Sequence, residues 1–172
     1  TTSFDRQSSE GWFPEYGGAA LGYLSVTLDC LWDLYEHTGD PRARRAMTRA
    51  VRFMASMVSV SGEVPVMINS RNTNYVVPYG LVRFGAEDPE AAALFCALYA
   101  RVDSPRHFLA HTDDRYACHY VYQSCFRALP HVERLNPDFD ALPCRKGGFE
   151  RFDDAGILVH HVPDESSVYV GA

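Results

Sequence analysis

The sequence lacks several features that would assign it to a class at once. It has no apolar run near the roughly 20 residues that a membrane-spanning helix needs, and no charged segment followed by an apolar stretch, as a signal peptide would have. No basic cluster stands out, and the net charge is −6. We therefore expect neither a membrane nor nucleic acid as a partner. The 172 residues, 47% of them hydrophobic and 13% aromatic, suffice for a domain with a real core.

Patterns of cysteine and histidine that bind metals are missing as well. The cysteines are odd in number and form no C-x-x-C pair: Cys30, Cys96, Cys118, Cys125 and Cys144. We expect reduced structural thiols, which favour the cytoplasm in a chain whose compartment the sequence otherwise leaves open. His107 and His111 lie four residues apart, but no Glu follows the first, so the zinc-protease motif is absent. We expect no metal and no other cofactor.

Apolar residues at helical spacing fill most of the chain. They predict helices over about 19–38, 41–58, 78–84, 89–101 and 113–129, with loop from 130 to 148. Asp40-Pro41 and Asp88-Pro89 each suit an N-cap followed by a first-turn proline. The two Asp-Pro turns indicate a weak repeat of the size of one helical hairpin. A mainly α fold follows, in which antiparallel helical hairpins over residues 1–145 form part of an α/α toroid.

The pattern changes to short β-type runs near Phe149. A short β-type run within Phe152–Val162 and a second run over Ser167–Val170, with a turn between them, predict a hairpin. Residues 146–172 are therefore expected to begin a β domain. His160 and His161 are neighbours on a strand and should point to opposite faces. Because the chain ends in a strand, we expect it to be part of a longer protein, with apolar surface that missing parts or a partner chain would cover.

One candidate site is the aromatic loop that precedes the first helix. Trp12, Glu15 and Tyr16 combine aromatic faces with a carboxylate, which suits the apolar C–H faces and hydroxyls of a sugar. Gly17 and Gly18 would permit close approach of a ligand to the backbone. The alternative is a loop that closes the end of a helical bundle with aromatic side chains.

A second candidate is the polar segment before the third helix. Arg71 could bind a carboxylate through its planar fork, beside Asn72 and Tyr75. Tyr79, if held near a cation, could have a depressed pKa and act as a base. The alternative is an interhelix loop whose Arg and Asn side chains cap helix ends.

A third candidate is a polar and aromatic helix face around His119. Tyr116, His119, Tyr120 and Gln123 share one face at helical spacing, and turned inward they could line a pocket. A core histidine hydrogen-bonded beside tyrosines is the alternative.

Several of these segments together resemble heparinase II/III-like proteins. The likeness rests on residues 10–18, on residues 70–80 and on the β run after Asp154. It implies an α/α toroid followed by a β-sandwich, and a polysaccharide lyase that cleaves uronic-acid glycans by β-elimination. Tyr75-Val-Val-Pro-Tyr79-Gly80 is similar to an element of chondroitin and hyaluronate lyases.

The resemblance implies roles for single residues. It makes Tyr79 the proton-transfer group, with Arg71 and Asn72 as carboxylate or sugar contacts. Where the lyase pattern has a His, this chain has Ser70, so His119 would have to supply the base from another helix. The expected partner is a polysaccharide or oligosaccharide. Two alternatives stay open: a glycoside hydrolase using Glu15 and Asp29, or a non-catalytic glycan-binding or scaffold module.

Overall fold

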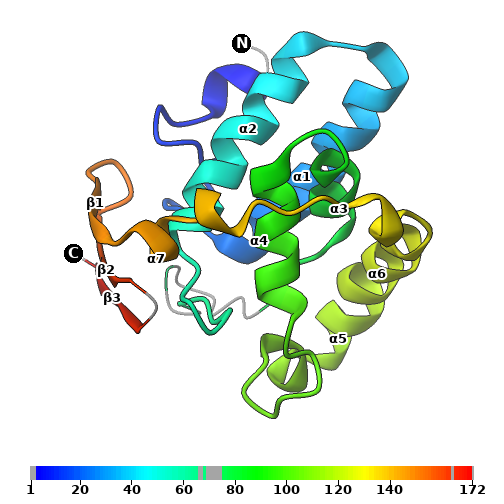
Figure 1. The fold of residues 1–172 in the computed structure, drawn as a ribbon. Coiled ribbons are helices and arrows are strands. Elements are labelled where there is room, and N and C mark those ends of the chain that lie inside the picture. The colour runs from blue at the N-terminus through cyan, green and yellow to red at the C-terminus, as the bar shows by residue number, and fades with distance from the viewer. Residues whose placement is uncertain (1–2, 66–67, 69–74, 164, 172) are drawn as a thin grey trace.

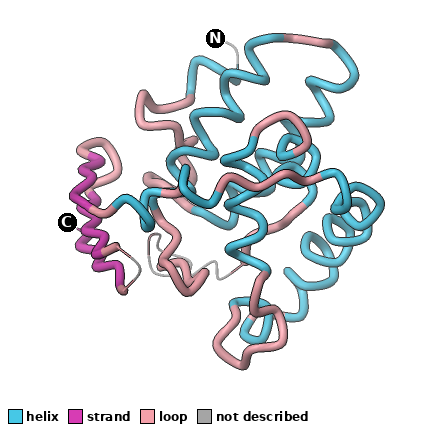
Figure 2. Tube along the Cα trace, viewed as in Figure 1, coloured by secondary structure: helices cyan, strands magenta, loops and turns pink. Residues whose placement is uncertain are grey.

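The computed structural model describes residues 3–65, 68, 75–163 and 165–171. Helices make up most of it, and a small antiparallel sheet lies at the C-terminal side (Figures 1 and 2). The mainly α fold class is thus confirmed. Among the described residues, no helix combines the length and apolarity needed to cross a membrane.

Helices α1 (Leu21–Thr38) and α2 (Pro41–Ser56) are joined by a two-residue turn. Gly39 ends α1 in the left-handed region, with φ at 67°, and its N–H donates to the carbonyl of Tyr35. Glycine adopts this conformation without the steric cost that a Cβ would bring. The Gly-Asp-Pro sequence thus encodes the turn, as the sequence predicts.

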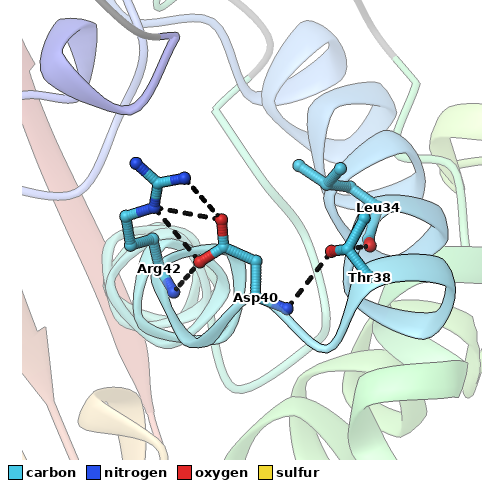
Figure 3. Close-up of polar contacts among 4 residues, drawn as sticks. All are labelled: Leu34, Thr38, Asp40 and Arg42. Carbon is cyan, nitrogen blue, oxygen red and sulfur yellow. Dashed lines mark hydrogen bonds and ion pairs between the residues drawn. The ribbon is translucent and has the colours of Figure 1, made fainter.

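The turn is closed by a short chain of polar contacts (Figure 3). The hydroxyl of Thr38 donates to the carbonyl of Leu34 at 2.6 Å and accepts from the N–H of Asp40 at 3.2 Å. The Asp40 carboxylate accepts from the backbone N–H of Arg42 at 2.8 Å and also pairs with its guanidinium. An N-cap of this kind typically stabilises a helix by about 1 kcal/mol.

Helices α3 (Tyr79–Gly85) and α4 (Pro89–Tyr99) form the second pair. Asp88 caps α4 by accepting from the backbone N–H groups of Glu90 and Ala91. Helix α1 packs against both α2 and α3, and α2 also contacts α4. Leucine, phenylalanine and methionine side chains fill the space between these helices, each at most 2% exposed: Leu24, Leu28, Phe53, Met54, Leu81, Phe84 and Leu94.

The stretch predicted as one helix over 113–129 is helical but not uniform. It contains α5 (Asp114–Tyr116), a π-helical turn η3 (Ala117–Val121) and α6 (Tyr122–Ala128). A π turn widens the helix and rotates the side chains that follow. The expected inward face is therefore wrong: Tyr116 is half-buried, whereas His119, Tyr120 and Gln123 are exposed.

The segment predicted as loop over 130–148 contains short helical turns. These are η4 (Leu129–Arg134), η5 (Phe139–Ala141) and α7 (Pro143–Lys146). Two of them have a proline in their first turn, where its fixed φ and missing N–H cost nothing. The prolines that indicated loop in the sequence therefore begin helices here.

Three strands make up the C-terminal sheet, in the order β1-β2-β3. They are β1 (Gly148–Phe152), β2 (Ile157–Val162) and β3 (Ser166–Gly171). The β2–β3 hairpin confirms the predicted one, and β1 is an addition. Its adjacent charged residues, Glu150 and Arg151, and its mostly exposed side chains belong to an edge strand, which leaves little hydrophobic pattern to detect.

One face of the sheet packs on the helices. Ile157 and Val159 are buried, and the rings of Phe53 and Phe152 meet edge-on with centroids 5.0 Å apart. His161 is 1% exposed on this face, while His160 is half-buried and stacks on another ring. The prediction that these two histidines point to opposite faces is confirmed.

Candidate functional site

Five tyrosines from separate parts of the chain converge on one place, which we call the tyrosine cluster. Ring centroids lie 5.9 Å apart for Tyr16 and Tyr23, and 6.3 Å apart for Tyr23 and Tyr75. Tyr75 in turn lies 5.0 Å from Tyr116 and 6.1 Å from Tyr120. The cluster joins the aromatic loop, α1, the segment before α3, and the α5–η3 stretch. Parts of all three candidate sites predicted from the sequence thus come together.

Tyr75 is the centre of this cluster. Its side chain is 1% exposed, and its buried hydroxyl finds no hydrogen-bond partner within the described part of the chain. Burial raises its pKa, and the neighbouring Tyr23 and Tyr116 raise it further. The hydroxyl therefore stays protonated at neutral pH and retains a hydrogen bond that it can donate.

Tyr16 and Tyr120 form the exposed rim of the cluster, with 55% and 39% of their surface accessible. Tyr16 has a φ of 50°, the left-handed region that non-glycine residues seldom adopt. Reciprocal backbone hydrogen bonds between Glu15 and Gly18, at 2.9 and 3.1 Å, hold this turn. Glu15 is half-buried and lies close enough to raise the pKa of Tyr75 further. Backbone strain of this kind often occurs at functional sites.

Trp12 has a different place from Tyr16. It is 8% exposed and packs in the main core, and its indole N–H donates to Glu10 at 2.9 Å. The Glu10 carboxylate also accepts from the backbone N–H groups of Asp154 and Ala155, at 2.8 and 3.0 Å. Trp12 thus anchors the loop against the β1–β2 turn. At this end of the loop, the aromatic side chain packs against the protein, as in the alternative of a loop that closes the helical bundle. The substrate-binding role of Trp12 gains no support.

Tyr79 is covered rather than open. It is 5% exposed, its N–H donates to the hydroxyl of Ser124 at 2.8 Å, and the Arg127 guanidinium lies over its ring. Burial raises the pKa of Tyr79 more than the nearby Arg127 lowers it. The depressed pKa that a neighbouring cation would produce is therefore a wrong expectation, because burial dominates.

Asp29, which the glycoside-hydrolase alternative would use as a catalytic carboxylate, lies beside Tyr79 and Ser124 and is partly buried. Its carboxylate accepts from the backbone N–H of Gly80 at 2.6 Å and from the hydroxyl of Ser124. Burial raises its pKa to about 6, against the lowering effect of these hydrogen bonds. These contacts connect α1 to α3 and α6 and give Asp29 a structural role.

The remaining predicted residues are placed only in part. His119 is exposed on the π turn, one residue before Tyr120. Arg71 and Asn72 lie outside the described residues, so their roles stay predictions. Within the described ranges, no three His, Cys, Asp or Glu side chains are grouped so that they could hold a metal ion, and no two cysteines form a disulfide. The candidate sites predicted from the sequence include Tyr16, Tyr75, Tyr116 and Tyr120, but nothing in the sequence indicates that these side chains meet.

Compared with known proteins, the chain matches no protein-family model, no curated protein and no solved structure.

Proposed function

We propose that this protein is carbohydrate-active and that the tyrosine cluster binds a saccharide chain. The observation that carries the proposal is the combination of exposed rings at the rim with a buried hydroxyl at the centre that has no partner in the described part of the chain. Exposed tyrosine rings stack on the apolar C–H faces of sugars, and a protonated phenol donates to a sugar oxygen. Glu15 adds a carboxylate that can accept from sugar hydroxyls.

The helical part supports an assignment to a partial α/α toroid. Pairs α1–α2 and α3–α4 each begin their second helix with an Asp cap followed by proline. Helix α6 and the residue after it leave an apolar stripe exposed: Tyr122, Phe126 and Leu129 are 67 to 68% accessible. In a toroid this stripe would pack against a further helix, supplied by another part of the same protein or by a partner chain.

A second candidate function is β-elimination from a uronic-acid glycan. The segment Tyr75-Val-Val-Pro-Tyr79-Gly80 favours this reaction. The resemblance implies Tyr79 as the group that transfers the proton, whereas the tyrosine cluster favours Tyr75 as the proton donor. The Tyr75 hydroxyl has no hydrogen-bond partner among the described residues, whereas Tyr79 is covered by Arg127.

His119, the base predicted from the sequence, would take the proton from the carbon next to the carboxylate, and the bond to the leaving oxygen would break as a double bond forms. Tyr75 would donate its proton to that oxygen, and Arg71 and Asn72 would contact the carboxylate. Burial raises the pKa of Tyr75, which suits a proton donor and not a base.

Affinity electrophoresis in gels containing heparin, alginate or chondroitin tests the binding proposal. We expect retardation in at least one gel, weakened in Tyr120→Ala and retained in Tyr122→Ala. Tyr122 is the matched control because it is an exposed tyrosine two residues away that stacks on Phe126, outside the cluster. Equal mobility of all proteins in every gel would refute the proposal. Ultraviolet absorbance of unsaturated ends, followed on the same polymers, tests the lyase reaction separately.

A further inference from the structure

A pocket of about 510 Å³ opens between the turn after α2 and the segment that follows α4. The turn contributes Glu63 and Val64, and the later segment contributes arginine, histidine and phenylalanine side chains. This volume falls within the range of small-molecule sites. None of the tyrosine-cluster residues is among its lining residues.

Two of the residues that line this pocket are arginines, Arg101 and Arg106. Within the described part of the chain, the guanidinium groups of Arg101 and Arg106 take part in no hydrogen bond or ion pair. Eight other arginines do, through contacts to Asp, Glu, Gln or His side chains: Arg42, Arg44, Arg49, Arg52, Arg83, Arg115, Arg127 and Arg151. In the segment that follows α4, the backbone N–H of Arg106 donates to the hydroxyl of Ser104 at 3.2 Å and holds the backbone in place. Two like charges lining one pocket repel each other, and an anion between them would relieve that repulsion.

Two histidines also line this pocket, His107 and His111, and the backbone engages both: Nε2 of His111 lies 2.8 Å from the carbonyl oxygen of Pro105. His107 is 7% exposed, and its Nε2 lies 2.8 Å from the carbonyl of Leu98, to which it donates. Its Nδ1 accepts from the backbone N–H of Leu109 at 3.2 Å. Because the backbone engages both ring nitrogens, His107 has no polar atom left to contact a ligand. The two arginines therefore carry the recognition of an anion.

The floor of the pocket is apolar. Leu98 and Phe108 are 1% and 6% exposed, and Val64 is half-buried beside them. A simple inorganic anion would leave this floor uncovered, whereas a ligand with an apolar body would cover it. Glu63 on the opposite turn would repel a second anionic group on the same ligand.

We infer that this pocket binds a small organic monoanion, a carboxylate or sulfonate attached to an apolar body. The anionic group lies between Arg101 and Arg106, and the apolar body lies on Phe108 and Leu98. The pocket is also connected to the tyrosine cluster. Leu109, in the turn η2 (Phe108–His111), packs against the small core around Tyr75, while its neighbour Phe108 lines the pocket.

Titrations with benzoate and with benzamide, its neutral analogue, test this inference. Amide resonances from 61–64 and 104–111 should shift with benzoate and stay in place with benzamide. Arg106→Gln and Arg101→Gln should each weaken benzoate about tenfold, as expected for one lost charge-assisted hydrogen bond. Arg45→Gln, an exposed arginine of α2 outside the pocket, is the matched control. Circular dichroism checks that each variant folds.

The inference is overturned if benzoate and benzamide shift the same resonances equally, or if benzoate shifts none of them. It is also overturned if both pocket variants bind benzoate as the control does. Tyr120→Ala should leave the benzoate titration unchanged, so that failure here is separate from failure of the saccharide proposal.

Discussion

The guanidinium carbon of Arg127 lies 3.7 Å from the centroid of the Tyr79 ring, and the same guanidinium pairs with Asp33 at 2.5 Å. Arg127 thus connects α6 to α3 and α1. Its guanidinium covers Tyr79, the residue to which the resemblance assigns the proton transfer. This contact assigns Tyr79 to the scaffold. The proposed saccharide contacts therefore fall to the tyrosine cluster around Tyr75.

Arg127→Ala should therefore lower stability and leave saccharide affinity nearly unchanged. The expected loss in the free energy of unfolding is about 1–2 kcal/mol, the sum of one cation–π contact and one partly exposed ion pair. Urea unfolding measures it, and affinity electrophoresis measures binding. A variant that is fully stable but no longer binds would assign Arg127 and Tyr79 to the binding site instead.

Asp29 should make the protein less stable as pH rises from about 4 to 6. Its pKa is raised from 3.8 to about 6 in the folded state, so the folded protein binds more protons than the unfolded chain across this interval. Stability falls with pH wherever the folded state binds more protons. The shift corresponds to about 3 kcal/mol at neutral pH. Asp29→Asn should remove this slope and raise stability at pH 7.

Urea unfolding at several pH values between 4 and 7 checks this prediction. The difference in free energy of unfolding between wild type and Asp29→Asn isolates the contribution of the Asp29 carboxyl group. Asp33→Asn is the matched control, one turn away on α1 and paired to the same network through Arg127. It should keep the pH slope and lose only a small, salt-sensitive amount of stability. A slope that is identical in wild type and Asp29→Asn would contradict the burial of this carboxylate.

Gly11→Ala should destabilise the protein by about 3 kcal/mol or more. Gly11 has a φ of 107°, and a Cβ there would lie 2.2 Å from the carbonyl oxygen of Arg49 on α2. Backbone strain and a clash with another backbone both contribute. Gly17→Ala is the control, because its φ is 89° but a Cβ would meet nothing within 4 Å. It should cost about 1 kcal/mol from strain alone. Thermal unfolding of both variants compares them, and equal losses would contradict the close approach to α2.

The sequence predicts the helical pairs well because their signals are local. Gly39-Asp40-Pro41 contains the end of one helix and the beginning of the next, and the apolar periodicity gives the packed faces. The edge strand β1 escapes prediction because its charged residues form no hydrophobic pattern. The π turn escapes because it changes the register of a helix without changing its composition.

The site is less predictable because it depends on contacts between distant segments. A choice between Tyr75 and Tyr79 cannot be made from their shared motif, since the difference is an arginine from α6 that covers one ring. Trp12 and Tyr16 are likewise near neighbours in one aromatic loop, yet one is 8% and the other 55% exposed. Burial separates packing anchors from binding surfaces, and it is a property of the assembled fold.

Calorimetric titration of Tyr75→Phe with the saccharide that the wild type binds tests the central claim most directly, alongside urea unfolding of the same two proteins. The substitution removes only a buried hydroxyl that lacks a partner among the described residues. We predict unchanged or higher stability together with an affinity about tenfold lower, because the lost group serves the ligand and not the fold. Lower stability with unchanged affinity would contradict the account, since the hydroxyl would then belong to the scaffold.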